Sequence, residues 1–187
     1  MARNVEIKAR IESIDSIFPR AAALADDGPI EIVQEDTFFA CERGRLKLRI
    51  FSPGEGQLIF YRRADRQGPK ESFYLVSPTT SPGTLRESLS LAYGPIGCVR
   101  KNRTLFLMGR TRIHLDRVEG LGDFLELEVV LEEGEQVETG EAIARDLMQK
   151  LQILPDQLIE GAYIDLLCAA GCLLNNSEVQ SPNQKMV

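Results

Sequence analysis

Charged side chains recur at every second position in several short segments of this 187-residue chain. In VEIKAR, Glu6, Lys8 and Arg10 alternate with apolar residues, and GRLKLRIF repeats the pattern with Lys47 and Arg49. Alternation at period two is typical of a β-strand with one apolar and one charged face. For any one strand, the simpler explanation is that the charged face is solvated.

The charges are also sorted by sign, which a merely solvated surface does not require. VRKNRTLFL carries a basic face, whereas FLELEVVL carries an acidic one. If the sheet closes into a barrel, these faces point inward around one cavity. The basic wall of that cavity is then predicted to comprise Lys8, Arg10, Lys47, Arg49, Arg63, Lys101 and Arg103, and the acidic wall Glu6, Asp116, Glu126 and Glu128.

Such a cavity is suited to phosphoryl transfer. The planar fork of arginine matches phosphate geometry, so the basic wall can bind a polyanion. Clustered carboxylates can bind a hard divalent cation such as Mg²⁺ or Mn²⁺. Positioned cations together with a metal ion stabilise the charge that develops during phosphoryl transfer.

The elements that must position these residues are mainly short strands. Because the pattern does not alternate strand with helix, it favours an α+β fold built around a closed antiparallel barrel with flanking helices. One domain is expected over residues 1–174, followed by a disordered tail over 175–187. Loops are expected at 26–29, 52–56, 64–70 and 132–135. Strands are predicted near 3–11, 31–40, 45–52, 57–63, 71–77, 97–108, 111–118 and 123–132, and helices near 13–25, 82–93, 137–151 and 157–170.

Composition and charge exclude several classes of protein. The net charge of −6 argues against a protein that binds nucleic acid by bulk electrostatics. No targeting segment is visible, and the apolar stretch at 164–174 is too short to span a bilayer, so the cytoplasm is the expected compartment. The four cysteines form no CxxC motif. The single His114 is expected to be a structural hydrogen-bonding residue, with a catalytic role as the alternative.

The ordered motifs resemble the CYTH superfamily, the triphosphate tunnel metalloenzymes, over about residues 3–167. VEIKARI matches the second half of the family's ExExK strand, with Asn4 in place of the first acid. The closest likeness is to the class IV adenylyl cyclase (CyaB-like) branch and to thiamine triphosphatases. The remaining motifs that carry the resemblance are LKLR with Lys47 and Arg49, Arg63 in LIFYRRAD, the KxR pair Lys101 and Arg103, and the acids Asp116, Glu126 and Glu128 in HLDRVEGLGDFLELE.

The resemblance implies an eight-stranded antiparallel tunnel in which the basic residues bind a triphosphate. Lys8 is then the expected catalytic residue, and the four acids hold one or two Mg²⁺ or Mn²⁺ ions. Hydrolysis of an inorganic or organic triphosphate is the leading prediction. The alternatives are a class IV adenylyl cyclase, which makes cyclic AMP and pyrophosphate from ATP, and a non-catalytic barrel that binds polyphosphate or nucleotide.

Asn4 can offer its carbonyl oxygen to a metal, or it can hydrogen-bond a substrate or a metal-bound water. The expected partner is a small molecule that contains a triphosphate, with neither nucleic acid nor membrane. A homodimer is compatible with the sequence.

Overall fold

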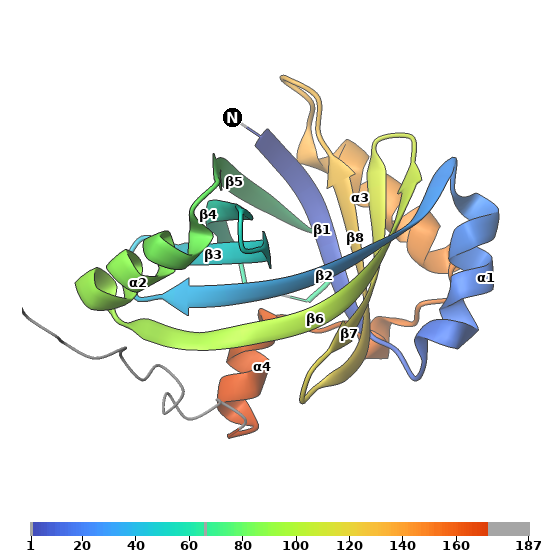
Figure 1. The fold of residues 1–187 in the computed structure, drawn as a ribbon. Coiled ribbons are helices and arrows are strands. Elements are labelled where there is room, and N and C mark those ends of the chain that lie inside the picture. Colours follow the sequence, from blue (N-terminus) through green and yellow to red (C-terminus); the bar gives the residue numbers. More distant parts are fainter. Residues whose placement is uncertain (1, 66, 172–187) are drawn as a thin grey trace, which may run out of the picture.

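The computed structural model describes residues 2–65 and 67–171 (Figure 1). Within these residues, eight strands close into an antiparallel barrel in the order β1-β5-β4-β3-β2-β6-β7-β8. This architecture confirms the predicted α+β barrel. The strands are β1 (Ala2–Arg10), β2 (Asp27–Phe39), β3 (Arg45–Ser52), β4 (Glu55–Arg63), β5 (Lys70–Thr79), β6 (Pro95–Met108), β7 (Thr111–Val118) and β8 (Gly122–Val130), and the helices are α1 (Ile14–Leu24), α2 (Pro82–Tyr93), α3 (Val137–Lys150) and α4 (Tyr163–Ala169), with a 3₁₀ turn at Pro155–Gln157.

The first strand closes the barrel. β1 pairs with β5 on one side and with β8 on the other, and both pairings are antiparallel. Because every neighbouring pair runs antiparallel, β1, β2, β4 and β7 begin at the end of the barrel where β3, β5, β6 and β8 finish. We call this the open end of the barrel and the opposite one the closed end.

Helices cover the apolar outer faces of the strands, which leaves the charged faces inside. Helices α1 and α3 lie along the side of the barrel formed by β1, β7 and β8 (Figure 1). Val5, Ile7 and Leu127 are buried in that core together with Leu147 of α3. The packing is close, since a Cβ built at Gly140 of α3 would lie 2.7 Å from a methyl carbon of Val5. Burial of apolar surface on this face stabilises the barrel with its charged side chains turned inward.

Two predicted boundaries differ from the structure. The expected loop at 26–29 is the start of β2, which pairs with the end of β6 through a register shift between Asp27 and Ile30. Gly28 permits this shift because its φ of 110° is open to glycine. The expected helix at 157–170 begins only at Tyr163, because Leu158 bridges Ala9 and the Ile159 amide donates to the Lys8 carbonyl. The tail predicted over 175–187 lies outside the described residues.

Candidate functional site

The inner faces of the strands enclose a cavity of about 460 Å³. Nine of the residues predicted from the sequence line it, so the alternation of charge marked the interior of the barrel. Arg10 and Asp116 do not line it. The predicted residues in the cavity wall are Glu6, Lys8, Lys47, Arg49, Arg63, Lys101, Arg103, Glu126 and Glu128.

Arg10 lies at the last position of β1, beyond the cavity. Its guanidinium donates to the carbonyl of Leu121 at 2.7 Å and stacks on the ring of Phe124 at 4.6 Å. The side chain is exposed, because β1 passes the closed end of the barrel before it reaches Arg10. The structure therefore places Arg10 apart from the other predicted substrate-binding residues.

Asp116 is fully buried behind the cavity wall and serves as a counter-ion. It accepts hydrogen bonds from Lys101 Nζ at 2.7 Å, from Arg103 Nε at 2.6 Å and Nη2 at 2.7 Å, and from the Tyr163 hydroxyl at 2.9 Å. Burial opposes its ionisation, but the charges of Arg103 and Lys101 hold the pKa of this carboxyl well below its usual range. With its oxygens engaged by these donors, Asp116 fixes the Lys101–Arg103 pair, while the metal-binding role expected from the sequence stays a prediction.

Asp36 has the same relation to the other basic pair, although it is not among the residues predicted from the sequence. Lys47 Nζ donates to it at 2.7 Å, and Arg49 donates through Nε at 2.8 Å and Nη2 at 3.0 Å. Each aspartate stands opposite its arginine across two adjacent strands, Asp36 to Arg49 and Asp116 to Arg103. The alternation in IVQEDTFF places Asp36 on the face of Gln34 and Phe38, which is the signal that could have revealed it.

The basic pair on β3 stays electropositive despite its counter-ion. Burial and the neighbouring charges of Arg49 and Lys101 lower the pKa of Lys47 to about 8, and Asp36 opposes that fall. Two cations share one carboxylate here, and the same holds at Asp116. Because the cations outnumber their carboxylates, the cavity retains capacity for the oxygens of a polyanion.

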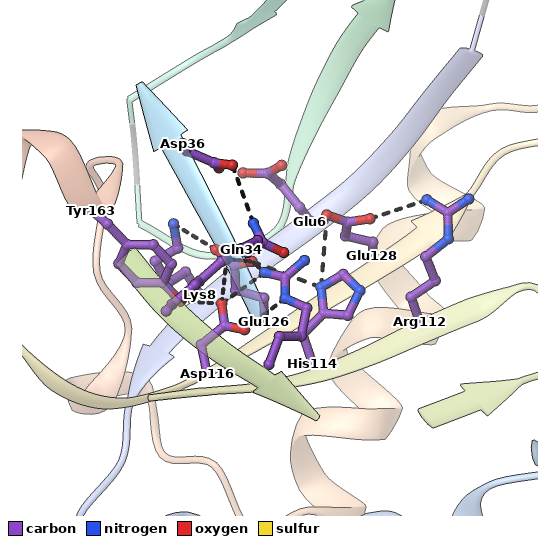
Figure 2. A network of polar contacts seen from close by, with 12 residues as sticks. Glu6, Lys8, Gln34, Asp36, Arg112, His114, Asp116, Glu126, Glu128 and Tyr163 are labelled. Carbon is purple, nitrogen blue, oxygen red and sulfur yellow. Dashed lines mark hydrogen bonds and ion pairs between the residues drawn. The ribbon is translucent and has the colours of Figure 1, made fainter. Parts of the chain in front are cut away.

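Three side chains on β7 and β8 form a candidate metal site (Figure 2). His114, Glu126 and Glu128 each offer one ligand atom, and these atoms lie within 4.8 Å of one another. His114 Nδ1 is 3.8 Å from Glu126 Oε2 and 3.9 Å from Glu128 Oε1, and it has no hydrogen-bond partner among the described residues. Burial lowers the pKa of His114, which favours the neutral imidazole that ligates metals. The donor set and the unpartnered buried nitrogen therefore fit a divalent cation.

Further acidic and basic groups surround this cluster. Lys8 Nζ lies 2.7 Å from Glu126 Oε1, and the two residues face each other across β1 and β8. Arg103 also pairs with Glu126. Glu6 faces Glu128 across the same strands and forms an ion pair with Arg63. Of the four predicted metal-binding acids, three thus line one side of the cavity.

Tyr163 of α4 packs against the basic groups from the closed end. Its ring lies 3.9 Å from Lys8 Nζ and 4.9 Å from Lys101 Nζ, while its hydroxyl binds Asp116. Cation–π contact of this kind restrains a lysine without neutralising it. The C-terminal helix therefore contributes to the site as well as covering it.

With this geometry in view, comparison with known proteins gives the family. The CYTH domain family matches residues 2–163, nearly the whole described chain. The chain belongs to this family. This CYTH protein is 28% identical over 193 residues to adenylate cyclase CyaB of Aeromonas hydrophila, a match that covers 95% of this chain and 94% of the relative.

Solved structures agree with the assignment. A Pyrococcus horikoshii OT3 protein superposes with a TM-score of 0.77 and 25% identity, covering 87% of the CYTH chain and 98% of its own. A Hippeastrum protein described as having a dominant triphosphatase activity shares the fold, with a TM-score of 0.63, 17% identity and coverage of 92% and 98%. The Aeromonas relative thus bears the name of an adenylate cyclase, and the Hippeastrum neighbour is described by its triphosphatase activity. In the described part of the CYTH chain, no helix combines the length and apolar character needed to cross a membrane.

Proposed function

We propose that this protein is a metal-dependent triphosphatase that hydrolyses a triphosphate inside the barrel. One observation carries the proposal: two lysine–arginine pairs, each anchored by a buried aspartate, face the same cavity as a histidine–carboxylate cluster. The lysine–arginine pairs supply a binding site for an anion with several phosphates. The histidine–carboxylate cluster supplies ligands for a divalent cation.

The buried aspartates prepare the cations for a phosphate chain. Lys47 and Arg49 approach from β3, and Lys101 and Arg103 approach from β6. Because Asp36 and Asp116 fix these side chains before substrate arrives, little conformational freedom remains to be lost on binding. Preorganised donors of this kind are also the main source of stabilisation for charge that develops in a phosphoryl-transfer transition state.

The metal would be held by His114, Glu126 and Glu128, with Glu6 close to them on β1. When bound, it supplies positive charge to the phosphate oxygens beyond what the side chains provide. Mg²⁺ prefers an all-oxygen octahedral set, whereas an imidazole nitrogen suits transition metals better. The mixed set of one nitrogen and two carboxylates therefore favours Mn²⁺ over Mg²⁺.

Hydrolysis requires fewer positioned groups in the site than cyclisation does. In hydrolysis, a water oxygen bonds to the terminal phosphorus and loses a proton. The bond from that phosphorus to the bridging oxygen breaks, the diphosphate part leaves with the electron pair, and the terminal group is released as phosphate. Lys8 lies between the Glu126 carboxylate and the Tyr163 ring, so it is positioned to donate to a phosphate oxygen in this process. Cyclisation needs in addition a ribose 3′-hydroxyl aligned with the α-phosphorus.

Adenylyl cyclase is the second candidate, favoured by the similarity to the Aeromonas enzyme. One assay separates the two. The purified protein is incubated with tripolyphosphate, thiamine triphosphate or ATP, each with Mn²⁺ or Mg²⁺, and phosphate, pyrophosphate and cyclic AMP are measured. We expect release of phosphate without cyclic AMP. Equal yields of pyrophosphate and cyclic AMP would establish the cyclase, and tight binding without any product would establish a non-catalytic barrel.

A further inference from the structure

The cavity is closed at one end by packed apolar side chains. Phe38 near the end of β2 and Val99 near the start of β6 line it there, beside Ala162 and Tyr163 at the start of α4. All four are buried in one cluster that also contains Phe124. In Figure 1, α4 lies below β6, which it contacts. A bound ligand that is longer than the charged middle of the cavity can therefore extend only toward the open end.

At the open end, the cavity wall is apolar and partly exposed. Ile32, Phe51, Val76 and Leu105 contribute to it, and Val76 keeps 44% of its surface exposed. Tyr74 of β5 adds a second aromatic ring to the same wall. None of these side chains carries a charge that could bind phosphate. Their partial exposure means that covering them with an apolar ligand surface would be favourable.

The charges that reach this end are already paired. Arg112 at the start of β7 faces Glu128 at the end of β8 and donates to it at 3.2 Å. This contact engages the Arg112 guanidinium with a carboxylate, so it is less available to a phosphate oxygen than the cations of the two lysine–arginine pairs. The open end therefore differs chemically from the charged middle, where two cations share each of Asp36 and Asp116.

Asn4 offers a hydrogen-bond acceptor toward the open end. It lies near the start of β1, opposite Ser72 of β5, and both residues line the cavity. Its side chain is 3% exposed, and Oδ1 has no hydrogen-bond partner within the described residues. A buried acceptor left without a partner is costly, so its presence points to a donor supplied by a ligand.

We propose that the open end binds the non-phosphate part of an organic triphosphate. A heteroaromatic ring would pack against Phe51 and Leu105, and a hydroxyl or amine hydrogen would be donated to Asn4 Oδ1. The inference rests on the proposed function, because the triphosphate must occupy the charged middle for the organic group to reach this end. Inorganic tripolyphosphate would fill only the middle and is therefore the poorer substrate.

Steady-state kinetics with ATP and with tripolyphosphate, both with Mn²⁺, test the proposal. The unmodified protein should show the higher kcat/KM for ATP. Phe51→Ala should raise the KM for ATP about tenfold, because an aromatic contact is lost. The KM for tripolyphosphate should change by no more than about twofold. Tyr93→Ala is the matched control, since this exposed aromatic residue on α2 lies outside the cavity. Its substitution should leave the KM unchanged for both ATP and tripolyphosphate.

The contribution of Asn4 has a separate readout. Asn4→Ala should raise the KM for ATP about fivefold while the calorimetric Kd for Mn²⁺ stays unchanged, because the lost hydrogen bond is to the organic group. A weaker Mn²⁺ affinity in this variant would instead make Asn4 a metal ligand and would overturn its assignment to the organic group.

The outcomes distinguish this inference from the proposed function. Two results would overturn the proposed organic subsite while leaving the proposed triphosphatase activity intact. One is a higher kcat/KM for tripolyphosphate than for ATP, and the other is an equal fall in kcat/KM for both substrates in Phe51→Ala. If neither substrate is turned over, the triphosphatase fails, and calorimetry with the same two compounds decides the subsite. Tighter binding of ATP than of tripolyphosphate, lost in Phe51→Ala, would support it, and the reverse order would refute it.

Discussion

Asp36 and Arg49 face each other across β2 and β3, and two hydrogen bonds of 2.8 and 3.0 Å join the carboxylate to the guanidinium. Asp116 and Arg103 repeat this arrangement across β7 and β6. In both places a lysine two residues before the arginine binds the same carboxylate. The barrel thus holds its basic groups in two matched sets, each with a buried acid behind it.

Removal of the carboxylate behind one set should destabilise the fold. In Asp36→Asn, Lys47 and Arg49 stay buried without their counter-ion, and the free energy of unfolding should fall by about 3–5 kcal/mol. Urea denaturation followed by circular dichroism measures this change. Asp65→Asn is the control, because Asp65 pairs with Arg45 at the surface and its loss should cost about 1 kcal/mol or less.

The loss of stability in Asp36→Asn should become smaller as the pH falls. The folded protein holds the pKa of Asp36 below its usual value despite burial, through Arg49 and Lys47, so the stabilisation is present above the unfolded pKa and is lost as pH falls. The gap between the two proteins should therefore narrow under acid. A gap that stays constant to strongly acidic pH would contradict a role as an ionised partner.

Lys47 should set an alkaline limit to substrate binding. Its pKa of about 8 means that the free enzyme loses this positive charge as pH rises through that value. A fall of kcat/KM above about pH 8 is expected, since this parameter reports the free enzyme. The groups that face Lys47 are Asp36, Arg49, Lys101 and the Tyr61 ring.

Lys47→Arg tests that assignment, because arginine stays charged throughout this range. The alkaline fall should move to higher pH in the variant even if the maximal rate is reduced. An unchanged profile would transfer the titration to another group, with Lys70 the first to examine, because burial also lowers its pKa to about 8.

Two adjacent arginines on β4 provide a direct test of the interior site. Arg63 lines the cavity and pairs with Glu6, whereas Arg62 is exposed on the outer face. Arg63→Ala should lower kcat/KM for a triphosphate by about 100-fold, the typical effect of removing one transition-state donor. Arg62→Ala should leave it unchanged. Equal effects of the two substitutions would mean that the inner face is not the binding surface.

Metal affinity should depend on the cluster on β7 and β8. Glu126→Gln and His114→Ala should each weaken Mn²⁺ binding, measured by calorimetry on the folded protein, by at least about tenfold because one ligand of a small set is lost. Glu119→Gln is a suitable control, since this exposed acid lies outside the cluster. Retained affinity in both cluster variants would require a different set, with Glu6 and Asp116 as the next ligands to test.

The sequence predicted well which side chains of each strand point inward, but it did not predict where the cavity ends along the strands. Alternation alone told which side chains share a face, and for Glu6 and Lys8 that face is the cavity wall. It also put Arg10 on the same face, although β1 has left the cavity by that position. Period-two patterning fixes the direction of a side chain and carries no information about how far along the strand the cavity extends.

By itself, the sequence determined the family, the barrel and the inward direction of most of its charged residues, because these depend on local alternation and on motifs read in order. Only the tertiary structure decided which charges meet. Strand register and barrel closure place Asp36 behind Lys47 and Arg49, put Asp116 in the same relation to Lys101 and Arg103, and bring His114 to Glu126 and Glu128. Such contacts join residues from different strands, and their distances are set by packing that no single segment of the chain contains.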